Sequence, residues 1–441
     1  MKIEINTARI MYVRISSLIS CLLGCWLCYS CQKIEYTEMK DPAYLRVFNS
    51  LNLPDLLENT GKDSLPYLCM LVNPVLDAAG NPVSAEIVGD FLKQRELYAP
   101  PYPVHIGAST SVDNPEYPGK ENVLVGPVLN GFDLSSWAQV PAGKLTFLFM
   151  YRPKNSTPFF ELAPELRKSK AVAGEFELTS GEVYTLQALY ANFSSRSRTL
   201  LLRREDFHKQ AFSDSLAYVN FYNYSAQGYQ EAPESQKLPN GRIKRHLFEG
   251  GIKDTMDVYL TLMKGQDFIP YQKGIVLRNG EEVAKSYSHQ YLYTVRRNIQ
   301  SAAPAPYASF PLWVKGDENG VYTDIWQRFY FISPSLQVTS GNHPFYEYGQ
   351  LIGDDWHVGG PFIDPKGQFA LLNCLLNGPI IYTGRDRYEY HMGENLPNMI
   401  INTHSGVDNP KSFPSANTVE VINGQAYLMT MQRKYAPPIY N

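Results

Sequence analysis

The chain has 441 residues, with 40 basic and 43 acidic side chains and a formal net charge of -3. Hydrophobic residues make up 44% of it and charged residues 19%, a composition too apolar for a disordered protein, and the near-neutral charge argues against a nucleic-acid binder, which needs a basic face. Aromatic residues reach 13%, with 31 Tyr, 31 Gly and 31 Pro, and this usage favours strands and turns over helices.

The first 30 residues have the form of a secretory signal. Lys2, Arg9 and Arg14 precede a mostly apolar stretch from 15 to 29. A basic region followed by a short apolar run is typical of a signal peptide, and the run is too short for a membrane-spanning helix. We therefore predict a signal peptide over 1–30 and a polar tether over 31–41.

Four of the six cysteines lie in this region, and their setting resembles a bacterial lipoprotein signal, in which a small residue precedes the cysteine that receives the lipid. They are Cys21, Cys25, Cys28 and Cys31. We favour Cys31 for lipidation because the chain turns polar directly after it, and Cys25 is the alternative because Leu-Leu-Gly before it matches the usual signal better. A metal site fits poorly, since the residues between the cysteines are mainly apolar and no His lies nearby. A cleaved signal without a lipid remains open.

The rest of the chain contains two pairs of similar segments, which suggest an internal repeat. The first pair is separated by 174 residues and the second by 243, so the second copy is expected to contain an insertion of about 69 residues. We predict a first domain over 42–204 and a second over 216–441. The link between them is charged and polar and runs from Arg203-Arg204-Glu205-Asp206 through Ser213-Asp214-Ser215. The pairs are 43–49 with 217–223, and 177–186 with 420–429.

Short aromatic and β-branched runs bounded by turn residues predict strands. Residues 145–151 and 257–262 fit this pattern, and two short strands flank a predicted hairpin loop at 316–320. Asn423-Gly424 is a predicted turn. Helical periodicity is weak, and its best candidate is 162–170. The fold class expected is all-β, with two antiparallel β-sandwich domains.

A lipoprotein signal, a short spacer and the strand-like segments 43–50 and 180–186 together resemble the Bacteroidetes cell-envelope lipoproteins with a DUF4397-like, immunoglobulin-type sandwich. The resemblance covers the ends of both halves and little of their middles. It implies two Ig-like sandwiches attached by lipid to the outer membrane, on its periplasmic or cell-surface side. It implies no catalytic residues.

No common catalytic motif is present. The sequence has no phosphate-binding loop, no Gly-x-Ser-x-Gly and no His-Glu-x-x-His. The stretch from 343 to 394 is the densest in Asp, Glu and His. A polar loop explains it best, while a pair of glycosidase carboxylates or a calcium site is the alternative. We predict no catalytic residue, no metal and no cofactor.

Aromatic residues gather in the second half, where they predict either a ligand-binding surface or core packing. Sugars stack on aromatic rings, so such a surface beside polar groups would suit a glycan, whereas a sandwich core uses the same residues for volume. The ligand-binding candidates are Trp313, Trp326, Tyr346, Tyr348, Trp356, Tyr388 and Tyr390.

The two remaining cysteines, Cys69 and Cys374, lie in apolar segments. The simplest interpretation is two buried thiols, with a disulfide as the alternative. Taken together, the sequence predicts a lipid-anchored envelope protein that binds a glycan or a surface protein partner and does not bind nucleic acid. A carbohydrate-active hydrolase and a structural subunit of an outer-membrane assembly are the alternatives.

Overall fold

The chain divides into two units, 1–38 and 39–441, and the structure, a computed structural model, describes most of the second. For some strand residues the description covers the backbone only. The residues described are 39–51, 67–92, 128–129, 132–134, 137–153, 155–237, 251–264, 268–271, 274–277, 281–282, 287–312, 314–315, 321–322, 325–335, 367, 369–375, 394–397, 399, 403–404, 410–411 and 414–433.

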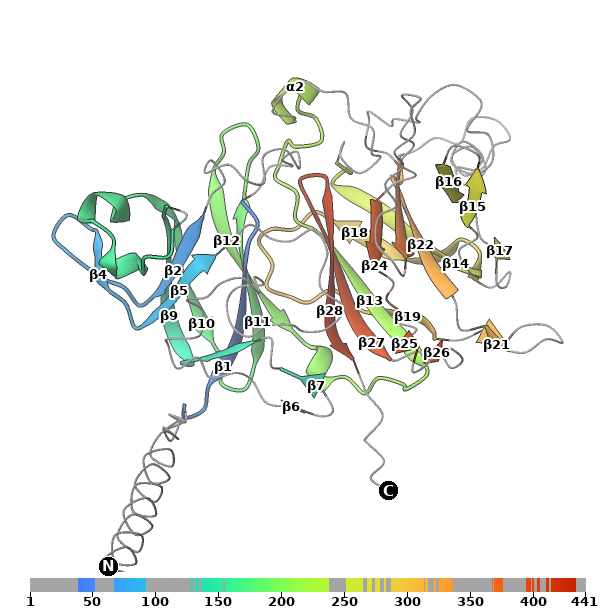
Figure 1. The fold of residues 1–441 in the computed structure, drawn as a ribbon, viewed down its shortest axis with the longest axis horizontal. Helices are drawn as coiled ribbons and strands as arrows, with labels where there is room; N and C mark the ends of the chain where they lie inside the picture. The colour runs from blue at the N-terminus through green and yellow to red at the C-terminus, as the bar shows by residue number, and fades with distance from the viewer. Residues whose placement is uncertain are drawn as a thin grey trace, which may run out of the picture. The chain divides into compact units, whose positions relative to one another are not determined.

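The first half of this unit forms two four-stranded sheets (Figure 1). Sheet 1 has the strand order β12-β11-β1-β8, and sheet 2 has the order β10-β9-β2-β5. In sheet 1, β1 runs parallel to β11 although the two are far apart in the chain. The strands are β1 (Ala43–Asn49), β2 (Leu68–Val72), β5 (Ile87–Leu92), β8 (Ala138–Val140), β9 (Gly143–Tyr151), β10 (Lys170–Leu178), β11 (Val183–Tyr190) and β12 (Arg198–Glu205).

The second half forms two further sheets. Sheet 3 has the order β19-β13-β27-β28, and sheet 4 has the order β17-β14-β22-β23-β24, with β18 also paired to β14. The strands are β13 (Leu216–Asn223), β14 (Thr255–Lys264), β17 (Glu281–Glu282), β18 (Gln290–Arg296), β19 (Ala308–Pro311), β22 (Ile325–Ile332), β23 (Phe369–Leu375), β24 (Glu394–Pro397), β27 (Ser415–Ile422) and β28 (Gln425–Arg433).

Short elements complete the described chain. Five two-stranded pairs stand apart from the four sheets, and the described helices are one α-helix and three 3-10 helices, none long or apolar enough to cross a bilayer. The pairs are β3 (Val75–Leu76) with β4 (Pro82–Ser84), β6 (Val128–Leu129) with β7 (Phe132–Asp133), β15 (Phe268–Tyr271) with β16 (Gly274–Leu277), β20 (Val314–Lys315) with β21 (Val321–Tyr322), and β25 (Thr403–His404) with β26 (Pro410–Lys411); the helices are η2 (Phe159–Glu161), η3 (Pro164–Arg167), η4 (Phe207–Lys209) and α2 (Glu234–Lys237).

The strand order of the first half recurs in the second. Sheet 3, read from β28, is β28-β27-β13-β19, so β13 takes the place of β1 and is likewise parallel to the last strand but one of its half. Sheets 2 and 4 share an antiparallel core, β10-β9-β2 and β23-β22-β14. The first predicted repeat, 43–49 with 217–223, therefore joins equivalent strands.

The second predicted repeat is wrong in its register. Gly181 lies between strands of two different sheets, β10 and β11, whereas Gly424 lies in the turn between β27 and β28, which are neighbours in one sheet. Both turns need a residue with positive φ, and both supply glycine. That shared local requirement produced the sequence match, so the length of the insertion has to be counted from β27 against β11 instead.

Each half has its own hydrophobic core, to which both of its sheets contribute. In the first half, Leu45 and Val47 of β1 pack with Phe147 and Phe149 of β9. In the second half, Val219 and Phe221 of β13 pack with residues of β14 and β22, including Leu260, Phe329 and Phe331. Alternate residues along a strand point to opposite faces, so these residues mark the face of each sheet that lies toward the core of its own half.

The opposite faces of sheets 1 and 3 are buried against each other. Tyr44 and Val183 of sheet 1 share a hydrophobic cluster with Ala416 and Met429 of sheet 3. A second cluster contains Leu189 and Leu201 from sheet 1 and Tyr222, Ile422 and Tyr427 from sheet 3. Sheet 1 is therefore buried on both faces, which explains why every residue of β1 is buried.

Three segments predicted as strands or as a hairpin have that structure. Residues 145–151 and 257–262 lie in β9 and β14, and β20 pairs with β21 across the predicted loop at 316–320. The best candidate for helical periodicity, 162–170, does not form an α-helix: it contains the 3-10 helix η3 and the start of β10, because Pro164 opens one tight turn and no longer apolar stripe follows.

The two cysteines that the structure describes, Cys69 and Cys374, are free and buried in different halves, so no disulfide joins them. Burial raises the pKa of both thiols well above the ordinary value, because a thiolate is poorly solvated in an apolar core. They act as small hydrophobic residues, as the sequence predicted.

Candidate functional site

Most residues predicted to bind ligand or lipid lie outside the described part of the chain. Trp326 alone has a place in the structure: it pairs with Met263 between β22 and β14, and its backbone is all that is described. The stretch 343–394 also falls almost wholly outside. The residues not described are Cys25, Cys31, Trp313, Tyr346, Tyr348, Trp356, Tyr388 and Tyr390.

An aromatic row that the sequence did not predict crosses the outer face of sheet 4. Tyr259 of β14 pairs in register with Tyr291 of β18 on one side and with Tyr330 of β22 on the other. Because Val258 and Leu260 point into the core, Tyr259 belongs to the opposite face. We call Tyr291, Tyr259 and Tyr330 the tyrosine row.

The tyrosine row runs from an exposed end to a buried one. Tyr291 is 51% exposed, whereas Tyr330 is buried. The rings of Tyr259 and Tyr291 meet edge to face with centroids 5.5 Å apart, and the ring of His289 lies 5.0 Å from that of Tyr330. Burial, followed by the nearby Asp257 carboxylate and Tyr291, raises the pKa of Tyr259, so its hydroxyl remains a hydrogen-bond donor at neutral pH.

Polar groups border this row. Thr294 Oγ1 donates to Asp257 Oδ1 at 2.5 Å and lies 2.9 Å from Tyr291 Oη. The backbone N–H of His289 donates to Thr261 Oγ1 at 3.0 Å. An aromatic surface beside hydroxyl and carboxylate groups can stack on an apolar ring face while hydrogen-bonding polar substituents at its edge. This combination matches a sugar ring, which presents C–H groups on its face and hydroxyls around its rim.

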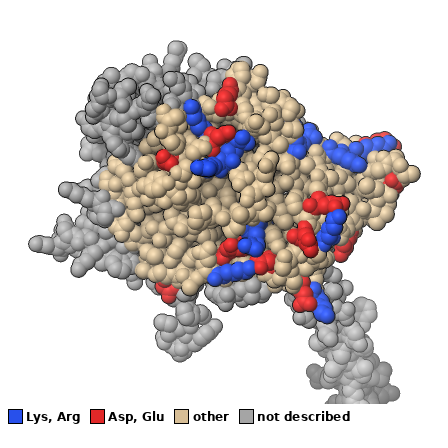
Figure 2. Space-filling model, turned by 180° about the vertical axis from the view of Figure 1, so that it is seen from behind, with Lys and Arg blue, Asp and Glu red and all other residues tan. Residues whose placement is uncertain are grey.

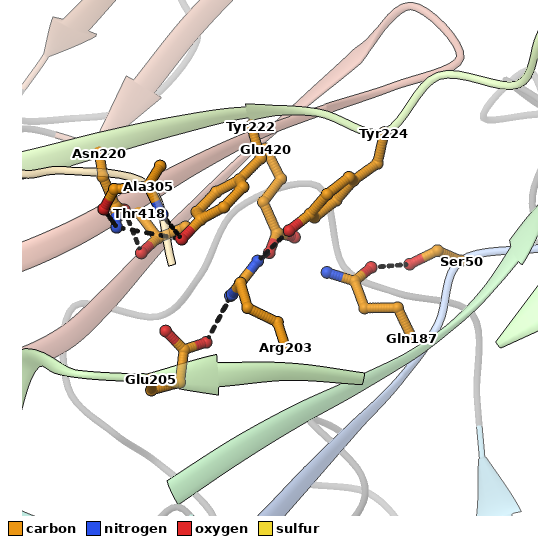
Figure 3. A network of polar contacts seen from close by, with 10 residues as sticks. All are labelled: Ser50, Gln187, Arg203, Glu205, Asn220, Tyr222, Tyr224, Ala305, Thr418 and Glu420. Atoms are coloured by element: carbon orange, nitrogen blue, oxygen red, sulfur yellow. Dashed lines mark hydrogen bonds and ion pairs between the residues drawn. The ribbon is translucent and has the colours of Figure 1, made fainter. Parts of the chain in front are cut away.

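A second polar group of residues lies between sheets 1 and 3 (Figure 3). Arg203 of β12 donates through Nε and Nη2 to Glu205 Oε1, at 2.8 and 2.5 Å. Its Nη1 donates to Glu420 Oε1 of β27 at 2.5 Å and to Tyr224 Oη at 3.0 Å. The Tyr222 ring stacks on the guanidinium, 4.3 Å from centroid to Cζ. We call Arg203, Glu205 and Glu420 the interface triad.

Further hydrogen bonds lie beside the interface triad, most of them along sheet 3. Thr418 Oγ1 donates to Asn220 Oδ1 at 2.7 Å, and Asn220 Nδ2 donates to the Tyr222 hydroxyl at 3.3 Å. That hydroxyl also accepts the backbone N–H of Ala305 at 2.8 Å. On sheet 1, Ser50 Oγ donates to Gln187 Oε1 at 3.1 Å. Figure 3 shows these side chains pointing into one layer between the strands.

Burial controls the ionisation of the interface triad. It raises the pKa of Glu205, because the loss of hydration outweighs the attraction and hydrogen bonds of Arg203. Burial alone would lower the pKa of Arg203, but Glu205, Tyr224 and Glu420 together raise it well above its ordinary value. The guanidinium therefore stays charged. Since all three side chains are fully buried, no substrate reaches them and their role is to join the two halves.

The charged run Arg203-Arg204-Glu205-Asp206, expected to begin the polar link, lies mostly in a strand, since its first three residues belong to β12. Arg203 and Glu205 are buried, whereas Arg204 on the other face of the strand forms an ion pair with Asp206 nearer the surface. The two-residue period of a strand could have indicated this burial, because it places Arg203 and Glu205 on the same strand face as the apolar Leu201. A charged pair on a buried face is uncommon, so composition favoured the exposed link.

On the face drawn in Figure 2, acidic and basic side chains are mixed among uncharged residues. Among the residues that the structure describes, no group of three or more His, Cys, Asp or Glu side chains could hold a metal ion. The outer face of sheet 4 is therefore the candidate site that the described residues support best.

No model of a known protein family matches the chain, and no curated protein matches it. Any function has to be argued from the residues and their arrangement.

Proposed function

We propose that this protein is a lipid-anchored, non-catalytic protein of the cell envelope that binds a glycan. In this proposal the leader is removed, Cys31 carries the lipid, and each half of the body is an Ig-type β-sandwich formed by its pair of sheets. The mostly-β architecture and the two shared cores are consistent with such sandwiches.

The tyrosine row is the observation that supports glycan binding. Solvent exposure decreases along the row, from Tyr291, which is open to solvent, to Tyr259, which is partly covered. The Asp257 and Thr294 side chains border it. Strands hold these groups in fixed positions, so little conformational entropy is lost on binding. A protein partner could use the same aromatic surface, and that alternative predicts binding that free sugars do not inhibit.

Binding of the purified protein to an array of bacterial and host glycans would test this function. We expect Tyr291→Ala to weaken binding of any captured glycan about 5- to 10-fold, because one exposed ring–ring contact contributes roughly 1 kcal/mol. Val83→Ala is a matched control, since Val83 is 52% exposed on the unrelated strand β4. Equal binding by both variants, or no bound glycan at all, would contradict the proposal.

The lipid anchor needs its own test. Mass spectrometry of the N-terminal peptide from membranes is expected to show a diacylglyceryl group on Cys31, and Cys31→Ala should release the protein from the membrane fraction. Modification at Cys25 would move the attachment site without changing the anchor. An unmodified N-terminus would contradict lipid anchoring and leave glycan binding untouched.

A further inference from the structure

The buried layer between sheets 1 and 3 joins equivalent faces of equivalent sheets. The strand registers define which residues correspond. Arg46 lies opposite Thr185 between β1 and β11, as Asn220 lies opposite Thr418 between β13 and β27. By the same registers Gln187 corresponds to Glu420, because they lie opposite Phe48 and Tyr222.

Corresponding residues also meet in the same clusters. Leu189 and Ile422 pack together in one hydrophobic cluster, and Val183 and Ala416 share another. Contacts of this reciprocal kind are the signature of a two-fold relation, as between the subunits of a symmetric dimer. The two halves of this chain therefore meet much as two copies of one subunit would.

The interface triad is where this symmetry breaks. Arg203 lies opposite Thr185, and the residue opposite Thr418 is Met429, so Arg203 corresponds to Met429. The positions that correspond to Arg203 and Glu420 therefore hold Met429 and Gln187. The first pair of positions forms an ion pair, the corresponding pair carries no charge, and all four residues are buried.

This asymmetry makes self-pairing unfavourable, above all for sheet 3. If two first halves met through sheet 1, Arg203 would face Gln187, lose its bonds to Glu420 and Tyr224, and keep those to Glu205 of its own strand. If two second halves met through sheet 3, Glu420 would face Met429 and be buried without a cation. A buried charge that loses its partner is strongly destabilising, whereas a surface charge can turn to water.

We propose that Arg203 and Glu420 make these two faces selective for each other, so that each half takes the other half of the chain as its partner and rejects a second copy of itself. Apolar contacts such as Leu189 with Ile422 would hold either arrangement, because they are alike in both halves. Selectivity then comes from the cost of the wrong pairing more than from the strength of the right one.

The test uses the full chain with a specific protease site inserted between Gln210 and Ala211, which are both exposed between β12 and β13. After cleavage, a cycle of mild urea and dialysis lets the halves exchange partners, and native mass spectrometry identifies the pairs. We expect only mixed pairs, one half of each kind. Same-half pairs, or separation of the halves, would overturn the proposal.

The decisive variant removes all three charges: Arg203→Met, Glu205→Gln and Glu420→Gln. Its two faces become alike at these positions, so same-half pairs should rise toward about half of all pairs, the proportion expected without selectivity. The control variant, Arg204→Met with Asp206→Asn, removes the neighbouring ion pair nearer the surface and should give mixed pairs only. A triple variant that still forms only mixed pairs would overturn the proposal.

A second measurement applies to the uncut chain if the triple variant fails to fold. Arg203→Met and Glu420→Gln should each lower the melting temperature by roughly 5–10 °C, and both together by clearly less than the sum, because the second change removes the charge that the first left unpaired. Additive losses would show that the two side chains are not coupled and would overturn the proposal.

Discussion

Glu205 of the interface triad links the stability of the protein to pH. Its pKa is raised above the ordinary value of 4.5, chiefly by burial, so the folded protein binds this proton more tightly than the unfolded chain does. By linkage, the stabilisation is fully present below pH 4.5 and is lost as the pH rises through the higher pKa of the folded state.

The first prediction concerns Glu205→Gln. The amide oxygen of the glutamine can still accept a hydrogen bond from Arg203 but carries no charge to bury. The unfolding free energy of the variant should therefore fall less steeply than that of the parent as the pH rises above about 4.5. Urea titrations at a series of pH values measure this slope. Glu175→Gln, which changes an exposed carboxylate on β10, is the control, and a Glu205→Gln slope equal to that of the parent would refute the prediction.

Residue-level features of this kind were only partly predictable. The burial of Cys69 and Cys374 followed from their apolar neighbours in the chain. The burial of Arg203 did not, because its bonds to Glu205 two residues on are completed by Glu420 of β27 and by Tyr224 just after β13, both far away in the chain. A partner brought by tertiary contact cannot be inferred from local composition.

Arg152 fixes the conformation of the segment that follows β9. Its Nη1 donates to Asp90 of β5, and its Nη2 donates to the backbone oxygens of Asn155 and Thr157 at 3.1 and 2.5 Å. Asp90 also accepts the backbone N–H of Phe159 at 2.6 Å. One buried guanidinium thereby fixes the path of the chain into η2, which covers the outer face of sheet 2 at Cys69 and Met150.

The second prediction is that Arg152→Lys destabilises the protein by about 2–3 kcal/mol, although the charge is kept. A single ammonium cannot reach Asp90 and both backbone oxygens in the geometry of a planar fork. Chemical denaturation measures the loss, and limited proteolysis should show earlier cleavage near Asn155. Lys144→Arg at the exposed pair with Glu175 is the control, and equal stability of both variants would exclude this role for Arg152.

The third prediction concerns the turn between β27 and β28, which the sequence identified. Asn423 and Gly424 both have positive φ, as a two-residue hairpin requires. Asn423 Oδ1 also accepts the backbone N–H of Ala226 at 2.8 Å. Asn423→Gly keeps the turn and removes that bond, so it should cost about 1 kcal/mol, and Asn423→Ala should cost more because it also strains the backbone. Thermal unfolding measures both, and the reverse order would refute the explanation.

Individual strands were more predictable than their pairing. β9, β14 and the short β20–β21 hairpin follow from alternation and turn residues close in the chain. The tyrosine row could not be found in this way, because Tyr259 meets Tyr291 and Tyr330 only in one register of three strands. A shift of one residue would turn the whole row to the other face, and sequence alone does not set that register.

At the scale of the whole molecule, the buried layer between sheets 1 and 3 should make the two halves unfold together. The fourth prediction uses the two buried thiols as reporters, Cys69 in the first half and Cys374 in the second. In urea both should become reactive toward a thiol reagent at the same concentration, as peptide mass spectrometry can show. With Arg203→Met the two transitions should separate, because the weakened layer no longer couples the halves. Two separate transitions in the parent protein would contradict this coupling.

The parallel pairing of β1 with β11, and of β13 with β27, has a consequence for the order of events as the protein is made. The first strand of each half remains without its central neighbour until nearly all of that half has emerged from the ribosome. Contacts so distant in the chain form slowly, because a long loop must close before they stabilise anything. Until then, the backbone N–H and C=O groups along that edge of β1 or β13 lack the partners that they have in the folded protein.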